Sequence, residues 1–209
     1  RVATLANSTG ALPPGSPVRH ARQDMLRSKS FDSHPIDSGD RFNLLDFSYE
    51  THRWARGLPP AWDNEANWPY AGPLLADPYM LPGSLDIRLA KSHLEEMLRI
   101  RKSIGLFRLA TAEEVTRQLS FHNTGPDQVP GLLVMKVAGE EETVVVLINV
   151  STEAHEFALE GASGFELHWI QQKSVDPVVR QSTFSPATGP FRVPARTTAV
   201  FVAWNEELN

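Results

Sequence analysis

The sequence predicts a mixed fold, in which an irregular N-terminal half is joined by a long helix to an all-β antiparallel sandwich. Three observations predict it. Residues 1–83 are rich in Pro, Gly, Asp and Asn and keep no sustained hydrophobic period. Residues 84–103 have helical spacing, and short β-branched or aromatic segments follow the helical part of the chain. A run of short strands without helices between them is typical of a sandwich.

Two helices are expected. The first follows Pro82-Gly83, with Ser84 as a candidate N-cap and Gly105 as its stop. A second is expected over residues 112–118, because Thr111 can cap it and acidic residues lie in its first turn. The apolar positions that give the first helix its period are Ile87, Ala90, Leu94, Met97 and Leu98.

The strands are expected in the second half, where β-branched and aromatic residues alternate with turn formers. Because the segments are short and regularly interrupted, they favour six or seven antiparallel strands. The expected ranges are 119–121, 131–137, 143–150, 155–159, 165–170, 191–193 and 197–204.

Composition excludes several classes of function. The chain has a net charge of −5, which argues against nucleic acid or an anionic membrane as the main partner. It has no run of about 18 apolar residues that would suggest a membrane span. It has no cysteine, which removes disulfides, thiolate nucleophiles, cysteine zinc sites and iron–sulfur clusters.

Motifs for metal, nucleophilic and phosphate chemistry are missing from the sequence. Its seven histidines are spread along the chain, without an HExxH pattern or a close pair. There is no GxSxG elbow, no GxGxxG and no GxxxxGK[ST] loop. We therefore expect no metal and no cofactor.

Residues 24–47 form a cluster with the character of a binding site. Three phenylalanines are interleaved there with Arg27, Lys29, Asp32, His34, Asp37, Asp40 and Asn43. Aromatic faces and hydrogen-bonding side chains are what a bound sugar requires, since its hydroxyl groups lose water on binding. The alternative is a solvated loop whose aspartates cap turns, and the residue types by themselves favour this alternative.

Several long motifs resemble one known family. The segments LRSKSFD, DSGDRFNLLDFSYET, NWPYAGPLLADP, MLRIRKSIGLFRLATAEEV, FHNTGPDQVPGLLVM and RQSTFSPATGPFRVPARTTAVFV are similar to the C-terminal portion of pullulanase-type starch-debranching enzymes. The likeness is strongest to the plant-type limit dextrinases of the alpha-amylase superfamily, and it covers nearly the whole chain.

The resemblance implies a domain organisation. Residues 1–105 are expected to be the C-terminal remnant of a catalytic (β/α)8 barrel, and residues 106–209 the C-terminal sandwich domain. Within the first part, 1–12 resemble the penultimate barrel helix, 15–21 the last strand, 22–83 the active-site loop, and 84–103 the last helix. A long irregular loop is expected there, since barrels place substrate contacts on their βα loops.

The resemblance also implies which residues contact sugar and which are missing. The implied substrate-binding residues are Arg27, His34, Asp40 and Asn43, with Arg27 the most direct match. The chain departs from the family pattern in three places: Arg22 replaces a glycine, His34-Pro35-Ile36 an Asp-Ser-Tyr triplet, and Arg41 a tryptophan. The three catalytic carboxylates of the superfamily are expected to precede Arg1, so that this chain by itself is expected to be inactive.

Two functions follow as expectations. The first is the C-terminal part of a hydrolase of α-1,6-glucosidic links in limit dextrin or pullulan, whose partners are α-glucan and the preceding part of the same enzyme. The second is a non-catalytic α-glucan-binding or scaffold module anchored by Trp54, Trp62 and Trp68. Residues 1–103 are expected to be mobile or aggregation-prone in isolation, and 106–209 to fold cooperatively. A plant-like enzyme would reside in a plastid, and another in the cytoplasm or outside the cell.

Overall fold

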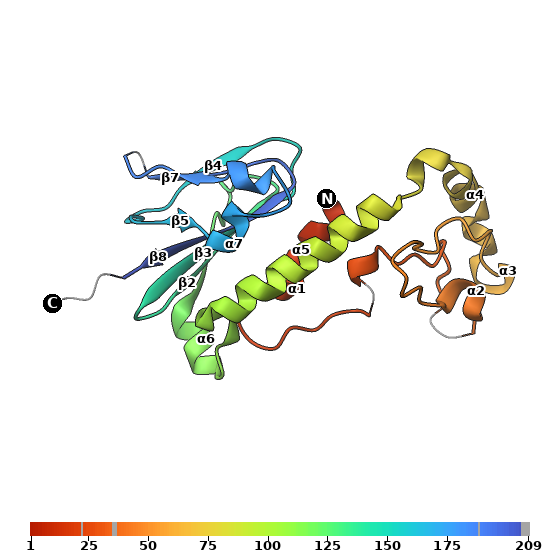
Figure 1. Ribbon diagram of the computed structural model, residues 1–209, viewed down its shortest axis with the longest axis horizontal. Coiled ribbons are helices and arrows are strands. Elements are labelled where there is room, and N and C mark those ends of the chain that lie inside the picture. Colours follow the sequence, from red (N-terminus) through yellow and green to blue (C-terminus); the bar gives the residue numbers. More distant parts are fainter. Residues whose placement is uncertain (22, 35–36, 188, 206–209) are drawn as a thin grey trace. The chain divides into compact units, whose positions relative to one another are not determined.

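The computed structural model of the chain describes residues 1–21, 23–34, 37–187 and 189–205. The chain divides into two compact units (Figure 1). Unit 1 comprises Arg1–Val18 and His93–Asn209, and unit 2 comprises Arg19–Ser92. The long helix α5, Ser84–Ser103, contributes its first half to unit 2 and its second half to unit 1.

Unit 1 is built on two antiparallel sheets. The five-stranded sheet has the order β1-β2-β3-β8-β5, and the three-stranded sheet has the order β4-β7-β6. The strand bounds are β1 Leu119–His122, β2 Leu132–Ala138, β3 Glu142–Asn149, β4 His155–Ala158, β5 Glu166–Leu167, β6 Thr183–Phe184, β7 Pro190–Val193 and β8 Thr197–Trp204. The predicted antiparallel sandwich is thereby confirmed.

The central strand β3 is buried on both faces. Val145 and Leu147 belong to the apolar cluster that includes Phe191 of the three-stranded sheet. Val144 and Val146 belong to a second cluster, which includes residues of the helices. Because successive side chains of a strand point to opposite faces, the unbroken apolar run of β3 serves both clusters at once.

Helices cover the second face of the five-stranded sheet. Helix α1, Val2–Ala11, contributes Leu5, and the second half of α5 contributes Met97 and Ile100, all buried in the cluster with Val146. These residues come from outside 106–209, yet they belong to the same compact unit as the strands. The division into domains at 105/106 stays a prediction. The compact units follow the packing of α1 and α5 on the sheet and divide at 18/19 and 92/93.

The end of α1 is fixed by one arginine. Pro13 and Pro14 follow the C-cap Leu12, and prolines have no N–H with which to continue the helix. The buried guanidinium of Arg101 donates to the carbonyl oxygens of Ala11 at 2.9 Å and Pro13 at 2.8 Å, and also to that of Gly15. The carbonyls left without intrahelical partners are thus satisfied by α5.

Both predicted helices are present. Helix α5 spans Ser84–Ser103, and α6 spans Ala112–Gln118 with a capping box between Thr111 and Glu114. Ser84 is the first residue of α5 and not its cap; the Asp86 carboxylate instead accepts the Gly83 N–H at 2.8 Å. After α5 the chain continues in the short 3-10 helix η4, Gly105–Arg108.

The predicted strand 165–170 is wrong beyond Leu167. Strand β5 covers only Glu166–Leu167, and helix α7, Trp169–Gln172, follows. The carboxamide of Gln171 takes the place of a longer strand beside β8. It donates to the Thr198 carbonyl at 2.9 Å and accepts the Val200 N–H at 2.7 Å. Unit 1 also contains η5, Val179–Gln181, and the short β6, which the sequence does not predict.

Unit 2 consists of loops and short helices. Its elements before α5 are η1 Gln23–Met25, α2 Asp40–Asn43, α3 Ala61–Asn64, η2 Glu65–Asn67, α4 Trp68–Ala76 and η3 Pro78–Met80. The N-terminal region that the sequence predicts to be irregular is thus partly helical, although no hydrophobic periodicity predicts these helices. Residues 15–21, which the resemblance places in a strand, pair with no other strand among the described residues.

Candidate functional site

The loop of unit 2 is organised around the buried carboxylate of Asp32. Its Oδ2 lies 2.8 Å from the Lys29 ammonium, and its Oδ1 accepts the His34 N–H and the Asn64 side-chain amide, each at 3.3 Å. Burial raises the pKa of Asp32, but the hydrogen bonds from Lys29 and Ser38 outweigh it, so that the pKa is lowered. Asp32 therefore holds the loop together as an anion.

Arg27 and Asn43, two of the predicted substrate-binding residues, are brought together by the structure. The half-buried Arg27 donates from Nη2 to the Asn43 backbone carbonyl at 3.5 Å. Its Nε is buried and has no hydrogen-bond partner among the described residues. A buried N–H without a partner is costly, and a ligand or another part of the protein would relieve that cost.

Asp40 lies close to Asn43 along the chain. It is the first residue of the one-turn helix α2, and Asn43 is the last. Residues three apart are neighbours on a helix surface, and the Asp40 side chain is exposed. Phe42 between them is buried and anchors the turn. Arg27, Asp40 and Asn43 thus gather around α2.

His34, the fourth predicted residue, faces an exposed tryptophan. Its ring centroid is 4.7 Å from that of Trp62, in an edge-on arrangement. Its Nδ1 accepts the Asp37 N–H at 2.8 Å. His34 therefore has a packing role where the family pattern has an anion. Arg22 and Pro35–Ile36 lie outside the described residues. Arg41, the remaining departure from the family pattern, is described, and its Nε donates to the Arg56 carbonyl at 2.7 Å.

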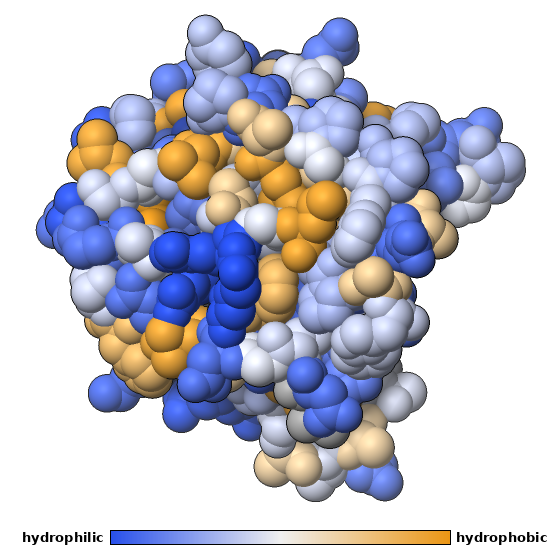
Figure 2. Space-filling view, turned by 90° about the vertical axis from the view of Figure 1, so that its right-hand side faces the viewer, coloured by the Kyte–Doolittle hydropathy of each residue, from blue (hydrophilic) through white to orange (hydrophobic). Residues whose placement is uncertain are grey.

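The other tryptophans of the loop are mostly packed. Trp54 lies 5.3 Å from Phe31 between ring centroids, and the Trp68 indole N–H donates to the Pro59 carbonyl at 2.9 Å. Both are half-buried, whereas 62% of Trp62 is exposed. Hydrophobic residues are exposed among hydrophilic ones on the face in Figure 2. Those exposed in unit 2 include Leu44, Phe47, Leu58, Tyr70, Tyr79, Met80, Leu81 and Leu85.

The backbone of this loop is unusually strained. Six described residues other than glycine have positive φ between positions 26 and 55: Leu26, Ser30, Phe31, Tyr49, Arg53 and Ala55. Such conformations cost free energy and are concentrated at functional sites. The strain therefore favours a functional loop over a merely solvated one.

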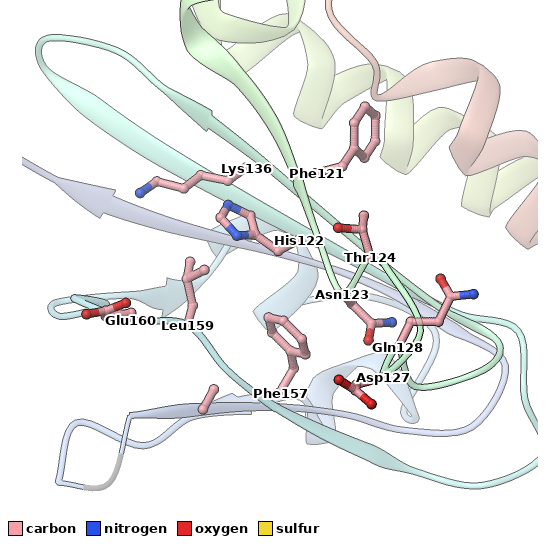
Figure 3. Close-up of a pocket in the computed structure, with 11 residues that line it drawn as sticks. Phe121, His122, Asn123, Thr124, Asp127, Gln128, Lys136, Phe157, Leu159 and Glu160 are labelled. Atoms are coloured by element: carbon pink, nitrogen blue, oxygen red, sulfur yellow. The ribbon is translucent and has the colours of Figure 1, made fainter.

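A cleft of about 590 Å³ opens at the edge of the sandwich in unit 1 (Figure 3). His122 and Lys136 line it from the five-stranded sheet, and Phe157 and Leu159 point toward them from the side of β4. Burial, together with the Lys136 charge, lowers the pKa of His122. The cleft thus has charged and apolar walls, without a pair of groups arranged for catalysis.

Asn123 shapes the connector between β1 and β2, residues 123–131, which lies beside this cleft. It has a φ of 56° and donates from Nδ2 to the carbonyls of Val129 at 3.0 Å and Leu132 at 2.6 Å. Its Oδ1 accepts the Val129 N–H at 2.7 Å. The family-like motif FHNTGPDQVPGLLVM is thus a closed turn between β1 and β2, and Asn123 is committed to its structure.

Two findings concern the described residues as a set. No group of three or more His, Asp or Glu side chains among them is placed to hold a metal ion. No helix in the part of the chain that the structure describes is long and apolar enough to cross a membrane.

Comparison with known proteins places the chain in a family. The family described as "Alpha-1,6-glucosidases, pullulanase-type, C-terminal" matches residues 49–204. The chain therefore belongs to the C-terminal region of the pullulanase-type enzymes, a class of starch-debranching hydrolases.

Relatives and solved structures agree with this assignment. "Pullulanase 1, chloroplastic" of Arabidopsis thaliana is 39% identical over 217 residues, which cover 97% of this chain and 22% of that protein. Pullulanase of Klebsiella pneumoniae is 29% identical over 210 residues, which cover 96% of this chain and 19% of that protein. The chain thus spans about a fifth of the length of these relatives.

Crystal structures of pullulanases have the same fold. PulA from Klebsiella oxytoca superposes with a TM-score of 0.86 at 28% identity, covering 98% of this chain and 20% of that one. The maltotriose complex of PulA from Klebsiella pneumoniae superposes with a TM-score of 0.87 at 27% identity, covering 98% of this chain and 23% of that one.

Proposed function

We propose that this chain is the C-terminal part of a debranching glycoside hydrolase that cleaves α-1,6-glucosidic links in limit dextrin or pullulan. In this proposal unit 2 supplies part of the substrate loop through Arg27, Asp40 and Asn43, and the catalytic carboxylates belong to preceding parts of the enzyme. By itself the chain does not hydrolyse the link. The gathering of Arg27, Asp40 and Asn43 around α2 is the observation that carries the proposal.

The carboxylates inside the loop support the predicted inactivity. Glycosidic hydrolysis needs a carboxylic acid that donates a proton and a second carboxylate about 5–10 Å away. Asp32 is held as an anion by Lys29, and hydrogen bonds from Ser48 and Thr51 lower the pKa of Asp46. A lowered pKa makes either group a poor proton donor at neutral pH.

Exposed apolar residues support the proposal that another part of the same enzyme covers this chain. Val18 is 90% exposed on the segment that the resemblance assigns to the last barrel strand, and Leu85 is 78% exposed on α5. Exposed apolar groups of this kind mark interaction surfaces. We propose that residues 1–105 complete a (β/α)8 barrel whose other strands and helices cover them, and that 106–209 form the appended sandwich domain.

A chimera tests this function. The corresponding C-terminal region of the Arabidopsis chloroplastic pullulanase would be replaced by this chain, and reducing ends released from pullulan would be measured. We expect the chimera to hydrolyse pullulan and the 209-residue chain alone to release nothing above background. Within the chimera, Arg27→Ala should lower kcat/KM at least tenfold, because a charged contact to substrate is lost.

Arg117→Ala serves as the matched control, since Arg117 is exposed on α6 in unit 1. It should leave kcat/KM within twofold. A chimera that folds, judged by circular dichroism and thermal unfolding, yet releases no reducing ends contradicts the function. Hydrolysis of pullulan by the chain alone contradicts the predicted inactivity.

A second candidate is a non-catalytic α-glucan-binding module. The exposed ring of Trp62 against His34 favours it, whereas Trp54 and Trp68 are occupied by packing. Titration of the chain with maltooligosaccharides, followed by tryptophan fluorescence, tests this candidate. A saturable change that Trp62→Ala removes would support it, and the absence of any saturable change would contradict it.

A further inference from the structure

A groove of about 500 Å³ in unit 1 is lined by two exposed tryptophans. Trp169 is 60% exposed and Trp204 is 73% exposed. Single exposed apolar residues need no explanation, but two indoles on one concave surface are an informative observation. Both residues lie in segments predicted as strands, and no sequence motif assigns a role to either.

The strand register builds the groove. Glu142 of β3 is paired with Trp204 of β8, and Glu166 of β5 is paired with Val202 of β8. Residues two apart on a strand share a face, so these four side chains lie on the same side of the sheet. Since β3 and β5 flank β8, the two glutamates come from strands roughly 10 Å apart. They border the groove from opposite sides.

The indole of Trp169 is held in place by its neighbour. It stacks on the His168 ring with centroids 5.6 Å apart and an interplanar angle of 29°. His168 is buried and is fixed by Ser103 Oγ at 3.1 Å and by the Ile170 N–H at 3.2 Å. An aromatic side chain that is already ordered loses little entropy when a ligand binds to it.

The second indole stands at the fixed end of β8. The next residue, Asn205, donates from Nδ2 to the carbonyls of Gly139 at 3.0 Å and Glu140 at 2.8 Å. Its backbone N–H donates to the Glu141 carbonyl at 2.8 Å. These bonds tie the end of β8 to the β2–β3 turn, and thereby fix the backbone that carries Trp204.

The polar groups of the groove select the chemistry of its ligand. Exposed Glu166 and Gln172 and half-buried Glu142 line it, and its described lining contains no lysine or arginine. Two carboxylates without a cation disfavour an anionic ligand. They are good acceptors for hydroxyl groups, whereas the indoles match an apolar flat surface. A neutral sugar chain, with C–H faces and hydroxyl edges, combines both.

We propose that this groove binds a short stretch of α-glucan, with sugar rings on Trp169 and Trp204 and hydroxyl groups donating to Glu142 and Glu166. The choice of an α-glucan among neutral oligosaccharides rests on the proposed function. The site lies in the sandwich and uses none of the residues of the unit 2 loop. It would keep a branched polymer attached while another segment of that polymer is processed.

Native affinity electrophoresis of the 209-residue chain through gels containing amylopectin tests the proposal, with maltoheptaose titration calorimetry as a second measurement. We expect retardation of the wild-type chain. Trp169→Ala and Trp204→Ala should each weaken binding at least fivefold, and the double variant should abolish it. Both side chains are exposed, so these variants should fold; circular dichroism and thermal unfolding verify this.

Matched controls separate this groove from exposed residues elsewhere on the chain. Tyr79→Ala, at an exposed aromatic residue of unit 2, and Arg117→Ala, at an exposed position of α6, should leave the retardation of the chain unchanged, and Glu166→Gln should weaken it while retaining the fold. Retardation that persists in the double tryptophan variant, or an unretarded wild-type chain, would overturn the proposal. Binding of cellohexaose without maltoheptaose would overturn the α-glucan assignment.

These outcomes are independent of the chimera. Loss of pullulan hydrolysis there with retained amylopectin binding here contradicts only the proposed function. Hydrolysis by the chimera together with unchanged binding in the double variant contradicts only the groove.

Discussion

Ser103 and His168 are 65 residues apart in the chain, yet Ser103 Oγ lies 3.1 Å from His168 Nε2. The Ser103 hydroxyl donates to the Ile100 carbonyl at 2.9 Å, so its oxygen accepts from Nε2–H. The other ring nitrogen, Nδ1, accepts the Ile170 N–H and caps α7. The neutral imidazole thus joins the end of α5 to the start of α7.

This arrangement predicts a loss of stability in mild acid. Burial lowers the pKa of His168 to about 4, from 6.5 for an exposed histidine. The unfolded chain therefore binds this proton first as the pH falls, and stability is lost between about pH 6.5 and 4. The full effect is on the order of 3 kcal/mol. Urea unfolding at pH 7.5, 6 and 5, followed by circular dichroism, measures it.

The variant His168→Asn isolates this effect. Asparagine keeps a side-chain acceptor for the Ile170 N–H but does not titrate. Because the chain has six other histidines, the comparison between the variant and the wild type is what counts. The variant should lose less stability than the wild type between pH 7.5 and 5. Equal losses in both would rule out His168 as the source.

Arg101 of α5 holds the end of α1, and its substitution should lower stability. Its guanidinium donates to three backbone carbonyls at and beyond the end of α1. Arg101→Met keeps the apolar stem but removes the donor of these carbonyls, the buried one of Ala11 among them, and should lower the free energy of unfolding by about 3 kcal/mol. Arg101→Lys should recover part of the loss, since one ammonium cannot reproduce the planar fork. Chemical denaturation measures both.

The neighbouring Lys102 provides the control. It is exposed on the same turn of α5, so Lys102→Met should change the free energy of unfolding by less than about 0.5 kcal/mol. Equal effects of Arg101→Met and Lys102→Met would show that the carbonyl contacts contribute nothing.

Local patterns predicted much of the fold and little of the candidate site. The capping box of α6 and the apolar run of β3 are contiguous in sequence, and both are present. Sequence patterns do not predict helix α7, because it depends on the contact of Gln171 with β8, 27 residues away. The Arg27–Asn43 and His34–Trp62 contacts likewise join separate turns of a loop without a period. No spacing rule encodes such contacts.

The hydrogen bonds and positive φ of Asn123 predict a graded loss of stability when this residue is substituted. Asn123→Ala removes three hydrogen bonds and puts a residue with no local hydrogen bonding at a φ of 56°, which should cost roughly 3–4 kcal/mol. Asn123→Gly loses the same bonds but accepts the backbone conformation, and should cost about 1 kcal/mol less. Thermal unfolding ranks the variants. Thr124→Ala, at the exposed next position, should be near neutral.

An inverted order at Asn123, with glycine more destabilising than alanine, would mean that backbone strain is not what asparagine relieves there. Equal stability of all four proteins would mean that the connector does not need its hydrogen bonds. The second result would also remove the structural reason for the long FHNTGPDQVPGLLVM motif.

Limited trypsin digestion of the chain tests where its stable unit ends. Leu5 and Leu12 are buried in the same cluster as Val144 and Val146, so residues 1–18 should stay bound to the sandwich after cleavage within unit 2. Trypsin sites in unit 2 include Arg27, Lys29, Arg53 and Arg56.

We expect a peptide from the N-terminus to copurify on gel filtration with a fragment that begins near His93, because separating them would expose one face of the sheet to water. Mass spectrometry of the purified complex identifies both fragments. If a folded 106–209 fragment survives instead and the N-terminal peptide is lost, the sandwich is stable without its helices, and the division at 105/106 describes the folding unit.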